Sequence, residues 1–576
     1  MKHLTTSLLI ASAGLLTHKI LKSQKPKEIQ LEENSYCELA DQLYYIPLPV
    51  LLYYIEIDDL VNITKVNPHF QNYIYNNIVP KDITIKDKNY GYELMKIFRN
   101  IEFDFRCIDI TDYDLEKFSN TIIQLSVISK KASITDVGLR CLTNLQSLHV
   151  YDNNTITNRG IENLPLTNLY ISSCPKITDI NKLTNLTSLD IDGNNITNDG
   201  IKQLVNLKKF TIGYRNKITD SGLLHLTNLK ELCLYQNDVI TDVGLSYLPN
   251  LTELNIMKNH MITSQGVSKL TNLIALSLEY NHDMDNGIRN LTTLQELYVG
   301  RSVDISDNGL ENLTNLTSLT LWDENKFITD NSIKKLVDLR SLDIRFHSGI
   351  TDNGLSNLTN LTKLYVAPHK DITDEGLKNL TNIVDLDISG NCHIGSNTLN
   401  RLTNLISLNL YNNNMIGDRC LQKLVNLQSL SLEYNNKITN DGILNLTNLS
   451  ELNLRGNKKI TDDGLWKLVK LTSLNLDYNE TISNEIVGKL TNLTHLYLCH
   501  NTKITNAGVK DLYNLIYLDI QNNSMITDGA ILELKKLQYL YLQGDTKLKI
   551  ETIKKLKCNI IKMGPIDEGK WIDDAR

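Results

Sequence analysis

The hydrophobic and polar positions of the chain repeat with a fixed period over most of its length. The first clear copy, ITDVGLRCLTNLQSLHVYDNN, runs from Ile134 to Asn154, and later copies follow mostly 22 residues apart. A period in this range predicts a solenoid, whose units bury their apolar sides against one another. Twenty positions carry the anchoring residue of this pattern: Ile134, Ile156, Ile177, Ile196, Ile218, Ile240, Ile262, Met284, Ile305, Ile328, Ile350, Ile372, Ile394, Ile416, Ile438, Ile460, Ile482, Ile504, Ile526 and Leu548.

The segment L-x-x-L-x-L in each copy predicts a β-strand. Its alternate residues point inward, as with Leu148 and Val150 in the first copy or Leu474 and Leu476 in a late one. An Asn follows the strand, and its carboxamide can satisfy buried backbone donors and acceptors. We therefore expect an internal ladder of Asn side chains, with members such as Asn237, Asn259, Asn281, Asn435, Asn457 and Asn479.

The segment I-T-D-x-G-L predicts a short helix or 3₁₀ turn. We expect its Asp to cap the free N–H groups of the first turn. The Gly that follows, as in Gly138 and Gly244, should let successive units approach closely. The Asp residues expected to act as caps include Asp136, Asp220, Asp242, Asp374 and Asp462.

This pattern resembles the leucine-rich-repeat family from about Ile134 to the C-terminus. The resemblance implies an α/β fold, a horseshoe-shaped solenoid of about 20 repeats of ~22 residues. The I-T-D-x-G-L half looks like the cysteine-containing repeats of F-box/leucine-rich-repeat proteins. The third copy, ITDINKLTNLTSLDIDGNN, looks more like the bacterial type.

The N-terminal segment IPLPVLLYYIEIDDLVNITKVNPHFQNYI resembles an F-box, a small all-α module. In that family the module docks an adaptor subunit of a ubiquitin ligase, so the resemblance implies a Skp1-like adaptor and a cullin complex as partners. A helical cap over the end of the solenoid is the structural alternative. The residues that match the F-box, and that would bind the adaptor, are Leu48, Pro49, Leu51, Leu52, Ile55, Leu60, Val66 and Phe70.

The chain is expected to contain five segments. Residues 1–42 would be an apolar N-terminal segment and linker, 43–80 the F-box-like module, 81–133 a transitional region with divergent repeats, 134–563 the solenoid and 564–576 a tail. A divergent repeat is expected around Ile110. The apolar run at residues 4–16 is short for a membrane span, and it leaves open a disordered or loosely helical terminus, a membrane anchor or a cleaved signal.

Composition narrows the classes of function. A net charge of −7 and a pI near 6.0 give no global electrostatic case for nucleic-acid binding. The nine cysteines are scattered without a CxxC pair, which suits a reducing compartment. Heavy use of Asn, Ile, Lys and Tyr is typical of AT-rich genomes, and giant viruses encode F-box/leucine-rich-repeat proteins that look similar. We expect an intracellular, cytoplasmic protein, in the host cytoplasm if the source is viral.

The motifs of common enzyme classes are absent from the sequence, including the P-loop, GxSxG, HExxH and the dinucleotide fingerprint. We therefore expect a protein that is not an enzyme and needs no cofactor. The outward residues of the strands, which would form a long concave surface, are the expected binding site for a protein target. Many of the 26 Tyr residues fall there, where they could anchor a partner or merely stabilise the sheet. They include Tyr151, Tyr170, Tyr235, Tyr280, Tyr298, Tyr365, Tyr411, Tyr434, Tyr478, Tyr497 and Tyr541.

One sector differs from the rest, because Ser302, Glu324, His347 and His369 replace the ladder Asn in four consecutive copies. We interpret this as a loss of the regular ladder beside a partner-binding hot spot. Glu324, His347 and His369 would also be acceptable zinc ligands, but such side chains more often satisfy backbone groups, so no metal is expected. The residues predicted to bind the partner are Tyr298, Arg301, Trp322, Asp323, Arg345, Phe346 and Tyr365.

The sequence favours a substrate adaptor of an SCF-like ubiquitin ligase, with the F-box-like module holding the adaptor and the repeats presenting a target. Two alternatives stay open. One is an interaction scaffold whose N-terminal helices only cap the solenoid. The other is a membrane-anchored or exported binding protein that uses residues 4–16.

Overall fold

The computed structural model describes residues 83–85, 88–97, 103–105, 110–127, 134–301, 303–322, 327–345, 347–544, 547–556 and 559–562. The F-box-like residues 43–80 and the apolar run 4–16 lie outside these ranges. Among the described residues, none of the helices has the length and apolar character needed to cross a bilayer. The internal contacts divide the chain into two units, Met1–Leu148 and His149–Arg576.

In the first unit, three short parallel strands pair in chain order, β1 with β2 and β2 with β3. The boundary between the units falls within β4 (Ser147–Tyr151). The other elements of this unit are β1 (Ile83–Ile85), α6 (Lys88–Ile97), β2 (Phe103–Phe105), α7 (Asp112–Lys117), β3 (Ile122–Val127) and α8 (Asp136–Leu139).

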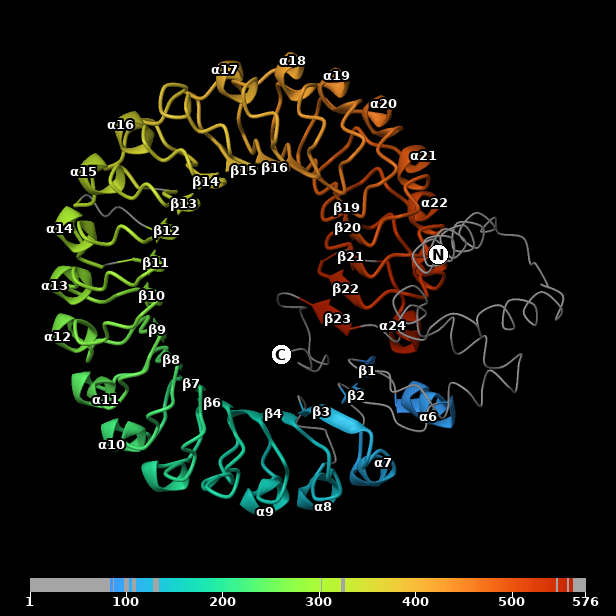
Figure 1. Ribbon diagram of the computed structural model, residues 1–576. Helices are drawn as coiled ribbons and strands as arrows, with labels where there is room; N and C mark the ends of the chain where they lie inside the picture. Colours follow the sequence, from blue (N-terminus) through green and yellow to red (C-terminus); the bar gives the residue numbers. More distant parts are fainter. Residues whose placement is uncertain are drawn as a thin grey trace, which may run out of the picture. The chain divides into compact units, whose positions relative to one another are not determined.

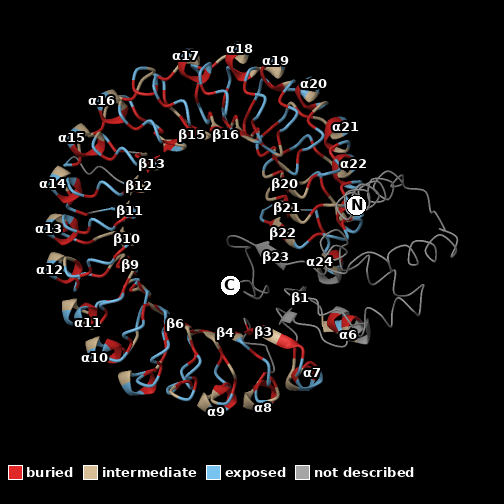
Figure 2. Ribbon diagram, viewed as in Figure 1, coloured by how far each residue is buried: buried red, intermediate tan, exposed pale blue. Residues whose placement is uncertain are grey.

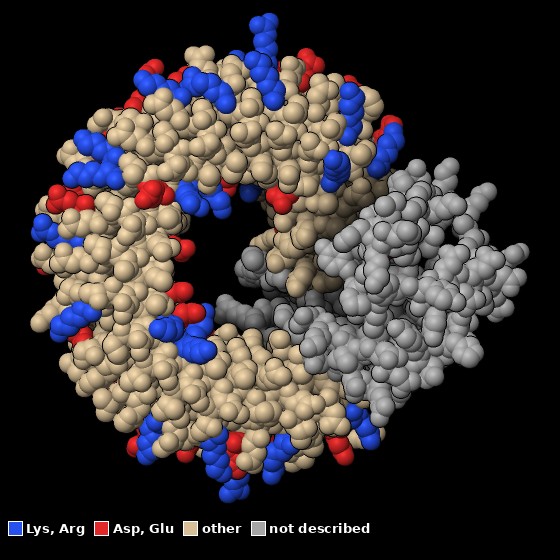
Figure 3. Space-filling view, in the orientation of Figure 1, with Lys and Arg blue, Asp and Glu red and all other residues tan. Residues whose placement is uncertain are grey.

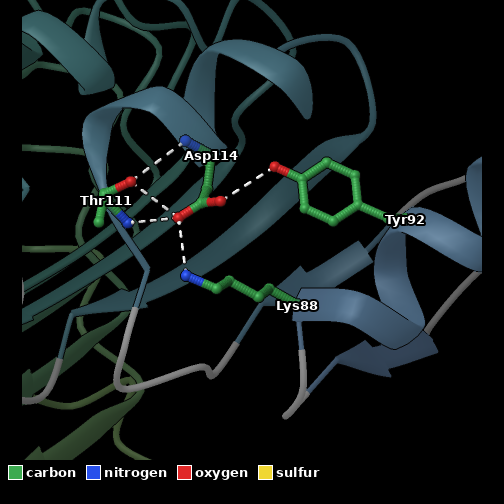
Figure 4. A network of polar contacts seen from close by, with 4 residues as sticks. All are labelled: Lys88, Tyr92, Thr111 and Asp114. Carbon is green, nitrogen blue, oxygen red and sulfur yellow. Dashed lines mark hydrogen bonds and ion pairs between the residues drawn. The ribbon is translucent and has the colours of Figure 1, made fainter.

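A buried carboxylate ties α6 to α7 in the first unit (Figure 4). Asp114 accepts hydrogen bonds from Tyr92 Oη at 2.9 Å and Thr111 Oγ1 at 2.8 Å, and Lys88 Nζ lies 3.3 Å from it. Burial opposes ionisation of Asp114, but the hydrogen bonds from Thr111 and Tyr92 outweigh it and lower the pKa. Burial and this carboxylate raise the pKa of Tyr92 to about 12. The network is therefore a structural link between two helices.

The divergent segment around Ile110 has the contacts of a regular repeat. Ile110 is buried, and Thr111 caps α7. Asp112 in turn accepts hydrogen bonds from the backbone N–H and hydroxyl of Thr135, at 2.8 and 2.6 Å, in the next repeat. The repetition thus begins before the first clear copy at Ile134.

In the second unit, strands β5 to β23 pair as parallel neighbours in chain order. The strands line the inner side of an arc, and the short helices follow its outer side (Figure 1). The strands are β5 (Asn168–Ser172), β6 (Ser188–Asp192), β7 (Lys209–Ile212), β8 (Glu231–Cys233), β9 (Glu253–Asn255), β10 (Ala275–Leu278), β11 (Glu296–Val299), β12 (Ser318–Leu321), β13 (Ser341–Asp343), β14 (Lys363–Tyr365), β15 (Asp385–Asp387), β16 (Ser407–Asn409), β17 (Ser429–Ser431), β18 (Glu451–Asn453), β19 (Ser473–Asn475), β20 (His495–Tyr497), β21 (Tyr517–Asp519), β22 (Tyr539–Leu542) and β23 (Asn559–Lys562).

Most repeats of this unit place one short helical turn between their strands. These elements are α9 (Asn158–Ile161), η1 (Asn198–Gly200), α10 (Asp220–Leu223), α11 (Asp242–Ser246), α12 (Ser264–Val267), α13 (Asp285–Ile288), α14 (Asp307–Leu310), α15 (Asp330–Ile333), α16 (Asp352–Leu355), α17 (Ser396–Leu399), α18 (Asp418–Leu421), α19 (Asn440–Ile443), α20 (Asp462–Leu465), α21 (Asn484–Val487), α22 (Asn506–Val509), α23 (Asp528–Ile531) and α24 (Ile550–Lys555). The predicted solenoid, with strands and short helical turns in alternation, is confirmed.

The apolar core is a continuous layer between the strands and the helical turns, drawn red in Figure 2. Each repeat contributes its anchoring Ile and the Leu residues of L-x-x-L-x-L. Ile460, Leu474 and Leu476 are typical, since none of them has any exposed surface. Each repeat buries its apolar side against the next, so no single unit needs a core of its own.

The predicted Asn ladder is confirmed along most of the second unit. Asn457 is fully buried, and its Oδ1 accepts hydrogen bonds from the backbone N–H groups of Lys459 and Ile460, both at 3.0 Å. Its Nδ2 donates to the carbonyl of Asn435, 2.7 Å away in the preceding repeat. One carboxamide therefore closes its own turn and bonds to the neighbouring turn.

The prediction that the Asp of I-T-D-x-G-L caps its own helix is wrong. The Thr before it is the last extended residue and takes that role in part of the copies, as in α11, where Thr241 Oγ1 accepts from the N–H of Val243 at 3.2 Å. The Asp is the first helical residue and bonds to the following repeat instead. Asp220 accepts from the N–H and hydroxyl of Thr241 at 2.8 and 2.7 Å. Asp242 and Asp462 make the same link to Thr263 and Ser483, and Asp374 accepts from the N–H of Gly395 and from Thr398 instead.

In many copies a Gly faces this second ladder. A Cβ atom at Gly244 would lie 2.5 Å from Oδ1 of Asp220, so a larger residue there would require a local shift. Ser332 stands at the same position of its copy and donates to Asp307, which still bonds to Thr329. The predicted close approach of successive units at Gly244 is confirmed.

A third row of cross-repeat bonds lies on the surface, in the T-N-L turn before each strand. Asn448 Nδ2, for example, donates to the carbonyl of Val425 at 3.0 Å. The Asn residues with an equivalent bond are Asn206, Asn228, Asn250, Asn272, Asn315, Asn360, Asn382, Asn426, Asn448, Asn492 and Asn514.

We predict that Asn457→Ala lowers the free energy of unfolding of the repeat region by roughly 2–5 kcal/mol, because two buried N–H groups lose their acceptor. The measurement is the urea midpoint, together with amide hydrogen exchange at Lys459 and Ile460, which should become faster. The control is Asn436→Ala at an exposed neighbouring position. Equal midpoints for the two variants would contradict the role of the ladder.

Candidate functional site

The outward face of the sheet in the second unit is the candidate site. We use this name for three residues of each repeat: the two residues on either side of the first buried Leu of L-x-L, and the residue that follows the second buried position. On β19 these are Ser473, Asn475 and Asp477. Because the strands stack in register, the three positions form three parallel rows, here called first, middle and last.

Acidic residues outnumber basic ones on the outward face. Figure 3 shows charged side chains of both signs along the inner rim of this unit. The acidic residues of the three rows are Asp190, Asp192, Glu231, Glu253, Glu279, Glu296, Asp343, Asp385, Asp387, Glu433, Glu451, Asp477 and Asp519, and the basic ones are Lys209, Lys363, Arg345 and Arg455. This balance favours a cationic partner over an anionic one.

The structure describes five of the predicted hot-spot residues and places them on β11 to β14 or within two residues of the ends of these strands. Tyr298 and Tyr365 are half-buried in the middle row. The strand register places Thr320 and then Asp343 between them. Tyr298 and Tyr365 therefore belong to one row without being adjacent.

Arg345 and Tyr365 form the one close cluster among these predicted residues. The Arg345 guanidinium bonds to the buried carboxylate of Asp343, with Nε–Oδ1 at 3.0 Å and Nη2–Oδ2 at 2.7 Å, and lies 5.5 Å from the centre of the Tyr365 ring. Tyr365 Oη in turn donates to Asp385 at 2.6 Å. Its pKa is raised, first by burial and then by Asp385. These bonds fix both side chains in place, with part of each exposed.

Trp322 is exposed directly after β12, the strand that pairs with β13, and Arg301 is exposed after β11. Asp323 and Phe346 lie outside the described residues. The predicted set did not include Asp343 and Asp385, the two carboxylates that hold Arg345 and Tyr365. Both residues could have been found from the sequence, because they stand at outward positions next to the Leu residues of L-x-L.

At His347 and His369 the ladder that we interpreted as lost is kept in part, through the hydrogen bond inside each turn. Both imidazoles are buried, and their Nδ1 atoms accept from the N–H groups of Gly349 at 3.2 Å and Asp371 at 3.3 Å. Burial lowers the pKa of His369. A neutral imidazole has one acceptor and one donor, so it can replace a carboxamide. Ser302 and Glu324 lie outside the described residues.

The zinc hypothesis gains no support from this placement. His347 and His369 face the interior of the turns, where they bond to backbone groups. In the part of the chain that the structure describes, no cluster of three His, Cys, Asp or Glu side chains could hold a metal ion.

A second aromatic cluster, which the sequence analysis did not single out, lies on β20 to β22. The ring of Tyr517 is 4.9 Å from the ring of Tyr497 and 4.9 Å from that of Tyr541, measured between centroids. Asp477 and Asp519, both buried, lie on the same face. Tyr517 stands in the first row and its two neighbours stand in the middle row. A comparison of residues within one row of the sequence repeat could therefore not reveal the contacts between these rings.

Two family models match the chain. The model described as the BspA type leucine rich repeat region matches residues 289–406 and 393–516, and the model described as a leucine rich repeat matches residues 141–165, 182–205 and 247–271. Both models describe repeats and neither describes a catalytic domain. The chain is therefore a leucine-rich-repeat protein, of a class that serves protein–protein recognition. A search of proteins with curated descriptions finds no match to it.

Several solved structures are similar to the chain. An internalin from Listeria monocytogenes is 26% identical, over 63% of this chain and 88% of the internalin, with a TM-score of 0.33. A leucine-rich-repeat protein of Leptospira interrogans is 25% identical, over 66% and 91% of the two chains, with a TM-score of 0.37. A TLR13–ssRNA13 complex contains a chain that is 19% identical, over 83% and 89%, with a TM-score of 0.47.

We predict that Asp477→Asn stabilises the repeat region at pH 7 by roughly 1–3 kcal/mol. Burial raises the pKa of Asp477 to about 6, and Asp519 adds to the shift. Between the unfolded pKa of about 3.9 and this value, the folded state holds a proton that the unfolded state has lost. The free energy of unfolding of the native protein therefore decreases as the pH rises through this window. The variant should not show this contribution to the decrease.

The measurement is the thermal unfolding midpoint from pH 4 to pH 7. Asp463→Asn, at an exposed position on α20, removes the same charge and is the control. A variant whose unfolding midpoint follows the pH curve of the native protein would contradict the prediction.

Proposed function

We propose that this leucine-rich-repeat protein acts without catalysis and binds a protein target on the outward face of its second unit. The observation that carries the proposal is the cluster of Arg345 and Tyr365, held by the carboxylates of Asp343 and Asp385 next to the exposed Trp322. Trp, Tyr and Arg are the residue types enriched at binding hot spots. A side chain that is already fixed by hydrogen bonds loses little conformational freedom when a partner binds.

The geometry of the sheet also favours a macromolecular partner. Parallel strands lie about 4.8 Å apart, so the four strands β11 to β14 present a surface that a small molecule would not cover. The rows continue from β5 to β22 without an interruption in strand pairing, which suits an extended contact with another protein.

We predict that Trp322→Ala weakens binding of the protein target by at least about tenfold, as expected for a hot-spot Trp. The target is first recovered with the full chain from cells of its source, and its dissociation constant is then measured for each variant. Trp466→Ala is the matched control, since Trp466 is exposed at the end of α20, away from the sheet. Equal loss for both variants, or none for Trp322→Ala, would contradict the proposed surface.

We further propose that residues 43–80 act as an F-box that holds a Skp1-like adaptor, so that the repeats present the target to a cullin-based ubiquitin ligase. The support is the resemblance of Leu48, Pro49, Leu51, Leu52, Ile55, Leu60, Val66 and Phe70 to that module, followed in the same chain by a repeat domain. The protein would then act inside the cell, in the host cytoplasm if a giant virus encodes it.

We predict that Leu51→Ala combined with Phe70→Ala abolishes recovery of the adaptor and cullin by the full chain, because both are the apolar contacts of an F-box. The thermal unfolding midpoint should stay within about 1 °C of the native value, and Lys65→Ala serves as the control. If no adaptor is recovered with the native chain and the double variant lowers the unfolding midpoint, the segment is a cap and the protein is a scaffold.

A further inference from the structure

The aromatic cluster on β20 to β22 forms one continuous surface. Tyr517 packs between Tyr497 and Tyr541, and the His495 ring lies 5.6 Å from the Tyr517 ring. All four side chains are only partly buried. Three adjacent strands thus present aromatic rings to the space in front of the sheet, as no other sector of the described outward face does.

Two buried carboxylates border these rings. The strand register places Asp519 in the middle row between Tyr497 and Tyr541. Asp477 lies in the last row of β19, two strands away, and each of the two side chains is 8% exposed. Asp477 accepts from the N–H of Cys499 at 2.7 Å, and Asp519 accepts from the N–H of Gln521 at 3.0 Å.

Among the described residues, no Lys or Arg forms an ion pair with Asp477 or Asp519. The contrast is Asp343 in the other cluster, whose charge is balanced by Arg345 at 2.7 Å. Arg455, the basic residue of the last row nearest in sequence to Asp477, is 3.6 Å from Glu433 and lies over the Tyr478 ring. Arg455 lowers the pKa of Asp477 as a nearby charge, but burial outweighs this effect. Two buried carboxylates without an ion pair to the described chain favour a cation from outside.

We propose that the surface formed by Tyr497, Tyr517 and Tyr541 with Asp477 and Asp519 binds a Lys or Arg side chain from a basic segment of the partner protein. The inference rests on the proposed function and specifies the chemistry of the partner at this sector. The faces of the Tyr rings attract a cation, and the two carboxylates supply the opposite charge. An anion such as a phosphate would meet only carboxylates and ring faces, so the same surface disfavours it.

Burial supports this assignment, because removal from water disfavours the ionised form of Asp477 and raises its pKa. A bound ammonium or guanidinium group would relieve that penalty and the mutual repulsion of the two carboxylates. A cation should therefore gain more here than at an exposed carboxylate elsewhere on the face, such as Glu296.

The test uses the full chain and two fluorescein-labelled peptides, hepta-arginine and hepta-citrulline, which match in shape and differ in charge. Fluorescence anisotropy at about 150 mM salt, where exposed charges are largely screened, gives the affinity for each. The double variant Asp477→Asn/Asp519→Asn keeps an oxygen for the N–H groups of Cys499 and Gln521. Its control, Glu253→Gln/Glu296→Gln, removes the same charge from the same face, on β9 and β11.

We expect hepta-arginine to bind the native chain and hepta-citrulline to bind at least about tenfold more weakly. The Asp double variant should lose about tenfold in affinity for hepta-arginine, and the Glu double variant should bind as the native chain does. Tyr517→Leu should also weaken binding and Tyr517→Phe should keep it, because the Phe ring still attracts a cation. These Tyr variants decide the question if the Asp double variant does not fold.

Equal affinity for the two peptides would overturn the inference, since the surface would then not attract the positive charge. Equal loss of affinity for hepta-arginine in the two double variants would also overturn it, since the attraction would then not be specific to Asp477 and Asp519. Such a result would leave the proposed function standing if Trp322→Ala still weakens binding of the natural target. If neither Trp322→Ala nor the Asp double variant weakens binding of the natural target, the outward face itself is not the recognition surface.

Discussion

The structure depends on one interaction, the hydrogen bonds of a buried Asn carboxamide that follows most of the strands. Asn457 shows it in full, with Oδ1 serving two N–H groups of its own turn and Nδ2 reaching the carbonyl of Asn435 in the preceding repeat. Turns stacked inside a solenoid are cut off from water, so their backbone groups must find partners within the protein. The side chain that solves this problem in one turn also sets the position of the next.

Two further rows of bonds hold the repeats at other points of their circumference. Asp220 links the helical turns through Thr241, and Asn448 links the surface turns through the carbonyl of Val425. The outward residues of the strands make none of these bonds, so they can vary without loss of the fold. This separation explains how one repeated sequence holds a rigid frame and still displays a different surface in each sector. Under the proposed function, recognition would depend on clusters such as Arg345 with Tyr365 or Tyr517 with its neighbours.

The fold could be predicted almost completely from the sequence because each feature is written many times. The strand with Leu474 and Leu476 inward, the Asn ladder and the close approach at Gly244 are all confirmed. The role of Asp220 was missed because the sequence shows only that an Asp starts a helix, and the direction of its side chain depends on the next repeat. His347 and His369 were misread in part for a similar reason, since an imidazole nitrogen can accept a backbone N–H as an amide oxygen does.

The candidate site was harder to predict, because contacts on the outward face join different rows. Trp322, Arg345 and Tyr365 could be placed there from their position after or within L-x-L. The partners Asp343 and Asp385, and the packing of Tyr517 between Tyr497 and Tyr541, depend on side-chain direction between strands about 22 residues apart. A one-dimensional pattern cannot specify such diagonal contacts. The F-box assignment of residues 43–80, which lie outside the described residues, stays a prediction.

Hydroxyl-radical footprinting of the protein with its bound target would test most directly whether the outward face is the recognition surface. Trp322, Tyr365, Trp466 and Tyr513 are reactive aromatic side chains, and only the first two lie on that face. The account predicts that the target protects Trp322 and Tyr365 from oxidation while Trp466 and Tyr513 react as in the free protein. Protection of Trp466 or Tyr513 with Trp322 and Tyr365 unchanged would contradict it.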